Sequence, residues 1–529
     1  MSFFDDASLV FLPSGQAGKD GKAYSMKPTN GDGDFTFSRG SNLTATRIDS
    51  NGLIEKGREN LFLNSDTPAT QSITITNGGV YVLSFLGTGS VVASGGASFT
   101  LNGTGEFDRV ENYFVSSSTS VTLTISGTIT EPQLELGLAA TEYILSGASS
   151  GKAGILEDSP RFDYSGGASC PSLLLEPSRT NLITQSEYLG GILTGNRMEI
   201  NNLVDTSPEG LINASKLVPD TTPNSTHQSN TSDYGSLVSG DKITISIFAK
   251  ADGFDGIILR FLNSSGAFTT NRIAKFDLSR GRWENDSMDG TTGVMQGEVG
   301  MEDYGNGWYR CYATATADAS GNVDIRIPVA DVTAEDVYDE VFTGNGTRGV
   351  LIYGLQLEQG SYPTSYIPNH SGGSVTREAD VNTLLNQSGV IGQTAGTILF
   401  DAYFDEAEKV NFSISDSTSS NFISIETTSS NEVTAKVEQG GSTQATITTT
   451  TSFFAEGDRL KCAISYDSRD MFFYINGTEV GTADTLTIPT CDDVRFGNYD
   501  GSIKAKQRVN RVVLFDTRIS DNNLATLTS

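Results

Sequence analysis

Two short sequence motifs each occur twice in this chain, and both times in the same order. An opening motif, R-x-N-L-x-x-x-S, stands at Arg58–Ser65 and again at Arg179–Ser186. A closing motif, Q-L-E-x-G-x-x-x-T-x-Y-I, follows at Gln133–Ile144 and again at Gln356–Ile367. The enclosed segments differ greatly in length, so the motifs indicate two separate modules rather than one continuous core.

The composition favours an all-β protein. The 529 residues include 57 glycines but 14 prolines, and β-branched and aromatic residues recur between polar turns. Apolar and small polar residues alternate with a period of two at 80–85, 121–127 and 308–316, which is typical of strands with one buried face. The predicted fold class is therefore all-β: a multi-domain string of antiparallel β-sandwiches after an extended N-terminal segment.

The motifs and the turns between them predict six segments. These are an N-terminal attachment and oligomerisation segment (1–57), a small β-sandwich (58–146), a linker (147–178), a larger β-sandwich (179–368), a second linker (369–392) and a third sandwich (393–529). The first segment has too little continuous apolar sequence for a core, so we expect it to pack on a neighbouring copy or a larger assembly. The third sandwich lacks both motifs, and we expect it at a distal tip.

The net charge argues against two classes of partner. With a formal charge of −29, the chain would be repelled by the phosphates of nucleic acid, whose binding depends on cationic side chains. No apolar stretch approaches the ~18 residues of a membrane span, so we expect no membrane insertion.

The cysteines are few and widely spaced. They show no C-x-x-C pattern, which excludes a zinc knuckle or a disulfide scaffold. Small buried apolar residues are the expected role for most of them, and a Cys462–Cys491 bridge stays open. The four are Cys170, Cys311, Cys462 and Cys491.

We expect no catalytic residue and no cofactor. The two histidines, His227 and His370, stand in polar runs and are expected in solvated loops. Acidic residues are adjacent in sequence, whereas a glycosidase requires two carboxylates that face each other across a cleft. Oxygen-rich turns at Asp32/Asp34 and Glu302/Asp303 could hold Ca²⁺, although no EF-hand loop accompanies them.

The strongest candidate for ligand binding is the outward face of strands in the larger sandwich. In 308–316, Tyr309, Cys311, Ala313 and Ala315 form the expected core face, and Arg260 and Arg326 likewise oppose apolar neighbours on their own strands. Aromatic rings stack on the C–H faces of sugars, and guanidinium groups donate to hydroxyls. A subunit interface uses the same residue types, and Trp308 could simply cap the core, so both alternatives stay open. The candidate glycan-binding residues are Trp308, Arg310, Tyr312, Arg260 and Arg326.

Several strings in the chain resemble virion proteins of tailed bacteriophages, namely fibre-type or decoration proteins with carbohydrate-binding-like sandwiches. They lie at Asp6–Gly15, Gly33–Gly40, Ala45–Glu55, Phe162–Leu182 and Gln356–Pro368. The string Y-G-N-G-W-Y-R at Tyr304–Arg310 is similar to carbohydrate-binding modules of the jelly-roll kind. Two further strings, Tyr474–Gly477 and Phe515–Leu527, resemble the concanavalin/laminin-G-like jelly roll.

This resemblance implies a non-enzymatic structural protein on the virion surface, either a fibre or a head or tail decoration. It implies a homotrimer whose N-terminal segment contacts capsid or tail proteins and whose jelly rolls bind glycans of the host surface or of mucus. Several weak sites on one particle would then act through avidity. Two alternatives stay open: a purely structural cement or spacer, and a polysaccharide depolymerase with a carboxylate cleft between subunits.

Overall fold

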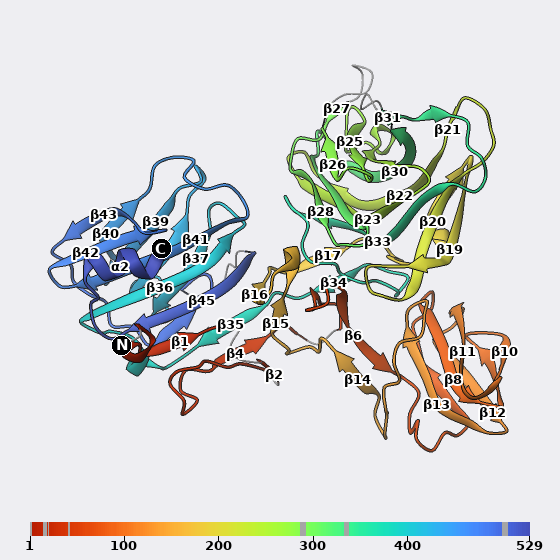
Figure 1. Cartoon of the computed structure of the whole chain (residues 1–529), viewed down its shortest axis with the longest axis horizontal. Coiled ribbons are helices and arrows are strands. Elements are labelled where there is room, and N and C mark those ends of the chain that lie inside the picture. Colours follow the sequence, from red (N-terminus) through yellow and green to blue (C-terminus); the bar gives the residue numbers. More distant parts are fainter. Residues whose placement is uncertain are drawn as a thin grey trace. The chain divides into compact units, whose positions relative to one another are not determined.

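The fold is almost entirely β-structure (Figure 1). The structure, a computed structural model, describes residues 3–13, 18–19, 21–40, 43–285, 293–332, 338–499 and 506–529; Ser14 and Gly15 of the first phage-like string lie outside them. Antiparallel sheets form several sandwiches, so the predicted all-β, multi-domain fold class is confirmed. Among the described residues, no helix is long and apolar enough to span a membrane.

The chain divides into two compact units, each built from separate stretches of sequence. The first unit comprises residues 1–42, 157–178 and 378–529. The second comprises 43–156 and 179–377. Short helices are α1 (Phe3–Asp6), α2 (Asp521–Thr528) and the 3-10 turns η1 (Ser165–Gly167), η2 (Leu189–Gly191), η3 (Asn263–Ser265) and η4 (Ser388–Val390).

The first unit is a sandwich of two sheets around an aromatic core that includes Phe400, Phe412 and Phe496. One sheet has the order β15 (Arg161–Asp163), β16 (Ser172–Leu175), β45 (Gln507–Phe515), β36 (Ala395–Phe404), β41 (Asp458–Asp467), β42 (Asp470–Ile475) and β43 (Thr478–Asp484), with β1 (Leu9–Phe11) also beside β45. The other has the order β2 (Gly18–Lys19), β3 (Lys22–Ala23), β4 (Phe35–Ser38), β35 (Val381–Leu384), β44 (Asp493–Arg495), β37 (Val410–Ser415), β38 (Phe422–Thr427), β39 (Val433–Gln439) and β40 (Ser442–Thr448).

Parts of the predicted N-terminal segment and linkers supply strands of this first unit. Leu9 pairs with Leu514, and Leu9 and Phe11 are fully buried in the core of their own chain. A buried ion-pair network joins the distant stretches. In it Asp380 binds Arg39 and Arg161, and Arg161 also binds Glu176 at 2.8 Å.

Several local features of the chain follow from the residues that stand there. Asn476 and Gly477 both have positive φ (48° and 83°), as a two-residue hairpin turn between β42 and β43 requires. Ser520 occupies the N-cap position of α2, where its side chain makes no capping hydrogen bond. All four cysteines are free, so the Cys462–Cys491 bridge does not form, and Cys311, Cys462 and Cys491 are buried as expected.

The second unit begins with the small sandwich. Its sheets have the orders β10 (Phe99–Asn102), β9 (Ser90–Gly95), β12 (Ser120–Ser126), β7 (Gln71–Thr74) and β11 (Gly105–Val115), β8 (Val80–Gly87), β13 (Ile129–Leu136). Alternate residues of these strands, such as Leu83, Phe85, Val121 and Leu123, form the core between the sheets.

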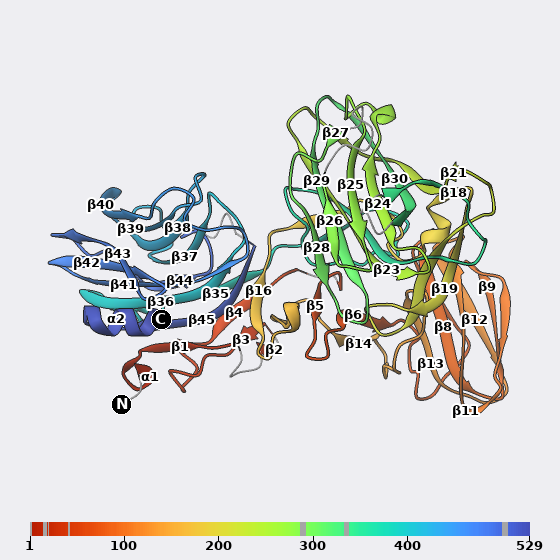
Figure 2. The same ribbon diagram turned by 45° about the horizontal axis from the view of Figure 1, so that its top comes forward.

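The larger sandwich of the second unit also has two sheets (Figure 2). One sheet is called the clasp sheet, after the hydrogen-bonded closure of the module that is described below. It has the order β19 (Met198–Thr206), β20 (Ile212–Pro219), β33 (Gly349–Gln359), β23 (Lys242–Asp252), β29 (Tyr309–Thr316) and β28 (Val299–Asp303). The other, the arginine sheet, has the order β18 (Thr194–Asn196), β22 (Gln228–Leu237), β30 (Gly321–Val332), β24 (Gly256–Phe261), β25 (Arg272–Asp277) and β26 (Arg282–Glu284).

Short strands extend these sheets or join the modules. In the arginine sheet, β27 (Gly293–Val294) pairs with β25 and β31 (Tyr338–Asp339) pairs with β30. The remaining pairings are β14 (Gly151–Gly154) and β5 (Thr46–Ile48) on either side of β6 (Ile54–Asn60), β17 (Arg179–Asn181) with β34 (Val375–Arg377), and β21 (Ser225–Thr226) with β32 (Val341–Phe342).

Each opening motif is fastened to its closing motif by the same buried hydrogen bonds, which we call the clasp. In the larger module, Asn181 Nδ2 donates to the carbonyl of Ile367 at 2.9 Å. Asn181 Oδ1 accepts from the backbone N–H groups of Ile183 and Leu357 at 3.1 and 3.2 Å. In the small module the same roles fall to Asn60, Ile144, Phe62 and Leu134.

The closing motif folds back on itself through its own side chains. Gln356 Nε2 donates to Glu358 Oε1 at 2.6 Å, and Gln356 Oε1 accepts from the N–H of Ile367 at 2.7 Å. Glu358 in turn accepts from the N–H and the hydroxyl of Thr364 at 2.9 and 2.7 Å. The same contacts recur between Gln133, Glu135, Ile144 and Thr141. The repeated letters therefore encode one hydrogen-bonded closure, used once in each module.

Candidate functional site

The five residues predicted to bind glycan lie on two different sheets of the larger sandwich. Arg310 and Tyr312 belong to β29 of the clasp sheet, and Trp308 immediately precedes that strand. Arg260 on β24 and Arg326 on β30 belong to the arginine sheet. The structure therefore separates the predicted set into two groups.

In the group on the clasp sheet, Trp308 and Arg310 are buried and Tyr312 is half-buried. Trp308 and Arg310 are each 3% exposed, and Ile48 and Ile54 of β5 and β6 belong to the same apolar cluster as Trp308. Trp308 Nε1 donates to the carbonyl of Thr206 at 3.2 Å. Trp308 thus caps an apolar cluster, which is one of the alternatives that the sequence left open.

The side chains of Arg310 and Tyr312 also have partners within the protein. Arg310 lies over the ring of Phe248, 5.6 Å from its centroid, and donates to Ser246 Oγ at 3.0 Å. Tyr312 donates its hydroxyl to Glu298 Oε1 at 2.8 Å. Burial, and then the charge of Glu298, raise the pKa of Tyr312 well above its ordinary value.

The group on the arginine sheet lies in one cross-strand row. Arg326 is directly opposite Asn230 on one side and Arg260 on the other, and Asn230 is opposite Thr194. Directly opposed residues of antiparallel strands point to the same face of a sheet. The intervening residues Leu259, Phe261, Ile325 and Ile327 are all fully buried in the core, so the row lies on the outer face, as the predicted strand phase requires.

The two guanidinium groups of this row carry unequal numbers of partners. Arg260 forms an ion pair with Glu340. Arg326 donates Nε–H to Asn230 Oδ1 at 2.9 Å, and its two terminal amino groups have no hydrogen-bond partner among the described residues. Burial lowers the pKa of Arg326, and the nearby charge of Arg260 lowers it further against the attraction of Glu340. The row therefore presents a partly exposed cation with unused donors.

The exposed tryptophan of the chain is one that the sequence reasoning missed. Trp283 is 45% exposed and lies on the edge strand β26, opposite the buried Phe276. Arg282 precedes it and donates to Asp277 at 3.3 Å. Its exposure could have been predicted from its place in the polar run R-G-R-W-E at 280–284. This run directly follows a turn and offers the ring little apolar sequence around it.

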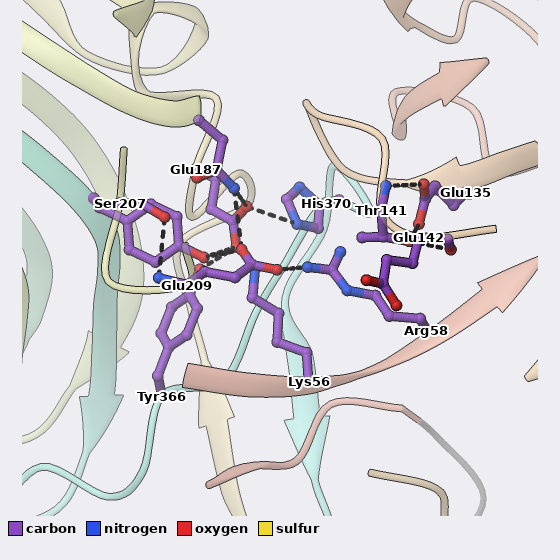
Figure 3. Close-up of polar contacts among 12 residues, drawn as sticks. Lys56, Arg58, Glu135, Thr141, Glu142, Glu187, Ser207, Glu209, Tyr366 and His370 are labelled. Carbon is purple, nitrogen blue, oxygen red and sulfur yellow. Dashed lines mark hydrogen bonds and ion pairs between the residues drawn. The ribbon is translucent and has the colours of Figure 1, made fainter. Parts of the chain in front are cut away.

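A second concentration of charge lies inside the second unit, where β6 meets the larger sandwich (Figure 3). Lys56 forms ion pairs with both Glu187 and Glu209, the latter at 2.6 Å, and Arg58 pairs with Glu209. Figure 3 shows these side chains converging from separate segments, with His370 beside the carboxylate of Glu187. The hydroxyls of Tyr353 and Tyr366 also reach Glu187, each at 2.9 Å, and Asn213 donates to Glu209 at 3.0 Å. We call this group the buried charge cluster.

The expectation that both histidines lie in solvated loops is wrong. His227 is fully buried, with Nδ1 at 2.7 Å from the carbonyl of Arg197 and Nε2 at 3.3 Å from that of Phe342. His370 is buried with Nε2 3.5 Å from Glu187 Oε2. Their polar sequence neighbours gave no sign of this, because the covering residues come from distant segments.

Burial and pairing act on the pKa values of the buried charge cluster in different ways. Burial lowers the pKa of Lys56 to about 7, against the attraction of Glu187. Burial alone would raise the pKa of Glu187, but the charges of Lys56 and His370 and their hydrogen bonds hold it well below its ordinary value. Because Lys56 bridges the two buried carboxylates, these ion pairs fasten β6 to the larger sandwich.

We predict that the second unit loses stability when the pH falls below the ordinary value of 4.5 for Glu187. The folded-state pKa of Glu187 is depressed, so its contribution is present above 4.5 and is lost as the pH falls through the folded-state pKa. Thermal unfolding followed by tryptophan fluorescence across this range measures the loss. A Glu187→Gln variant should be less stable at neutral pH and should show a shallower decline; an equally steep decline would contradict this assignment.

Three carboxylates of the turns considered for Ca²⁺ accept hydrogen bonds from the protein itself. Asp34 accepts from the N–H of Ser25 at 2.9 Å, Asp32 from the amide of Asn30, and Asp303 from the N–H of Gly305 at 2.7 Å. Among the described residues there is no group of three or more His, Cys, Asp or Glu side chains placed to hold a metal ion.

Comparisons with known proteins give local structural similarity. No protein-family model and no curated protein sequence matches the chain. One similar structure is the CBM40 of the IT-sialidase from Ruminococcus gnavus bound to α2,3-sialyllactose, with 16% identity, 26% of this chain and 84% of that chain covered, and a TM-score of 0.23. Another is domain 4 of AbnA, a GH43 extracellular arabinanase from Geobacillus stearothermophilus in complex with arabinotriose, with 13% identity, coverage of 30% and 77%, and a TM-score of 0.24.

The receptor-binding domain of botulinum neurotoxin type G is similar at the same level, with 13% identity, coverage of 28% and 41%, and a TM-score of 0.22. Carbohydrate-binding modules are therefore among the structural neighbours. At such TM-scores the similarity carries no conclusion about the ligand or the function of this chain.

Proposed function

We propose that this chain is a non-enzymatic protein of a tailed-phage virion surface, a fibre or a head or tail decoration, whose larger sandwich binds glycan. The phage-like strings of the sequence support the virion role. The row formed by Thr194, Asn230, Arg326 and Arg260 supports carbohydrate binding, and it is the observation on which this part of the proposal depends.

The row suits an extended polar ligand. Neighbouring strands lie about 4.8 Å apart, so four strands place hydroxyl, amide and guanidinium groups at regular intervals across the sheet. Thr194 is exposed, and Asn230 and Arg326 are half-buried, so their polar groups can be reached from solvent. A saccharide offers hydroxyl groups at comparable intervals, and the fixed fork of Arg326 can donate to two of them.

The wider assembly belongs to the same proposal. The protein would act as a homotrimer, contact capsid or tail proteins through its N-terminal segment and hold host-surface or mucosal glycans through several weak sites. A purely structural cement or spacer is the rival in which no glycan binds. A depolymerase would release reducing sugar from host polysaccharide, which our proposal excludes.

We predict that Arg326→Ala weakens glycan binding by the full chain at least about tenfold, because it removes the least satisfied donors of the row. Binding to a glycan array, followed by calorimetry with the best ligand, measures this effect. Arg469→Ala is the matched control, since its side chain is 77% exposed and lies in the first unit.

Two other outcomes would count against the row. Normal binding by Arg326→Ala together with loss in Trp283→Ala would move the site to the sheet edge. The absence of binding to any glycan by the wild-type protein would favour the structural rival. Trp308 is unsuitable as a test of contact, since it is buried and its replacement would disturb the apolar cluster.

A further inference from the structure

We propose that the arginine row selects saccharides that carry a carboxylate group; this inference rests on the proposed glycan-binding function and specifies its ligand. Two cationic side chains stand directly opposite each other on neighbouring strands, at Arg260 and Arg326. Like charges in this position destabilise a sheet. A ligand carboxylate beside them would reduce their mutual repulsion.

The protein's own carboxylates compensate this pair incompletely. Glu340 pairs with Arg260. On the same outer face, Lys275 pairs with Glu284 at 3.0 Å. Asp324, two residues before Arg326, accepts from the N–H of Asp233 at 3.1 Å. Among the described residues, no ion pair forms between Arg326 and an acidic side chain, so the two arginines share the charge of Glu340 alone at this point of the row.

The position of Arg326 allows the recognition geometry that a carboxylate requires. Asn230 holds Nε and so orients the guanidinium plane, while both terminal amino groups stay free of protein hydrogen bonds among the described residues. A guanidinium binds a carboxylate through two parallel N–H···O bonds, and these are about twice as strong as bonds between neutral groups. A lysine at this position would supply the charge without the fork.

The strongly acidic character of the whole chain does not oppose this selection at close range. The net charge of −29 slows the approach of an anionic polymer, but charges beyond about 8 Å are largely screened at physiological ionic strength. Salt weakens both the distant repulsion and the local attraction, so salt dependence alone would not identify the contact. Chemical removal of the ligand's carboxylate isolates the local attraction between that group and the arginine row.

The test therefore compares hexuronate oligosaccharides and other carboxylated glycans with their carboxyl-reduced counterparts, which differ only at that group. For wild-type protein we expect at least about tenfold tighter binding to a carboxylated member than to its reduced partner. Arg326→Gln should abolish this preference, so that the variant binds both members of each pair equally and more weakly than the wild-type protein binds the carboxylated one. Arg326→Lys should keep part of it, and Arg469→Gln in the first unit should keep all of it.

The outcomes separate this inference from the proposed function. Equal wild-type binding to both members of each pair would overturn the carboxylate selection and leave glycan binding intact. A preference that survives in Arg326→Gln would also overturn it. Binding of neither carboxylated nor neutral glycans would overturn the proposed function itself. Tryptophan fluorescence and thermal unfolding of each variant establish that its second unit is folded, since both tryptophans lie there.

Discussion

Replacement of Lys56 by methionine is expected to lower the free energy of unfolding of the second unit by about 3–5 kcal/mol. The change keeps most of the side-chain volume but removes the cation between Glu187 and Glu209. Glu209 would retain Arg58, whereas Glu187 would be left buried beside His370 and the two tyrosine hydroxyls. Removal of one partner of a buried ion pair is costly because the remaining charge has lost its solvent as well as its partner.

The measurement uses the position of the two tryptophans. Both Trp283 and Trp308 lie in the second unit, so their fluorescence during denaturation by urea follows that unit alone. Lys216→Met is the matched control, because Lys216 pairs with Asp252 at the surface of the same unit. The control should cost about 1 kcal/mol or less. Similar losses in the two variants would show that the buried charge cluster does not stabilise the unit as described.

Replacement of Asn181 by alanine is expected to cost roughly 3 kcal/mol or more in the same unit, because it leaves several buried backbone groups unpaired. The N–H groups of Ile183 and Leu357 and the carbonyl of Ile367 would all lose the clasp asparagine. Water cannot readily replace it, since the side chain is fully buried. Tryptophan fluorescence in urea again measures the loss.

Asn201→Ala is the control for this prediction. Asn201 lies on β19 of the same sandwich, is partly exposed, and its side chain has no hydrogen-bond partner among the described residues. We expect a change within about 0.5 kcal/mol for the control. Equal stability of Asn181→Ala and the wild-type protein would mean that the repeated asparagine is not needed to close the module. Asn60→Ala provides an independent test in the small sandwich, where the same bonds recur.

The sequence predicts strand burial and turn geometry well, because both depend on residues that are neighbours in the chain. Strand phase follows from alternation, so the burial of Cys311, Ala313, Ile325 and Ile327 could be read directly from the sequence. The Asn476–Gly477 hairpin follows from the conformations that those two residues tolerate. The duplicated motifs also predicted two modules, and their polar letters turn out to be the hydrogen-bonding groups of the clasp.

The candidate site was predicted less well, because burial of an outer sheet face depends on segments far away in the chain. Nothing near Trp308 indicates that Ile48 and Ile54 pack over it. The same holds for His370, whose neighbour Glu187 precedes it by more than a hundred residues. The alternation places Arg310 and Arg326 equally on outer faces, and only the tertiary packing leaves Arg326 accessible and Arg310 buried.

The pairing of β1 with β45 has a consequence for the order in which the protein can fold. Leu9 pairs with Leu514, so β1 cannot pair with its neighbour until β45, about 500 residues later in the sequence, has been synthesised. The second unit contains none of the residues beyond 377 and can complete its sheets while synthesis continues. We expect nascent chains that stop before β45 to hold a folded second unit and an incomplete first one. Only chains that extend through β45 would then bury Leu9 and Phe11, so the burial of these two side chains reports that β45 has joined the sheet.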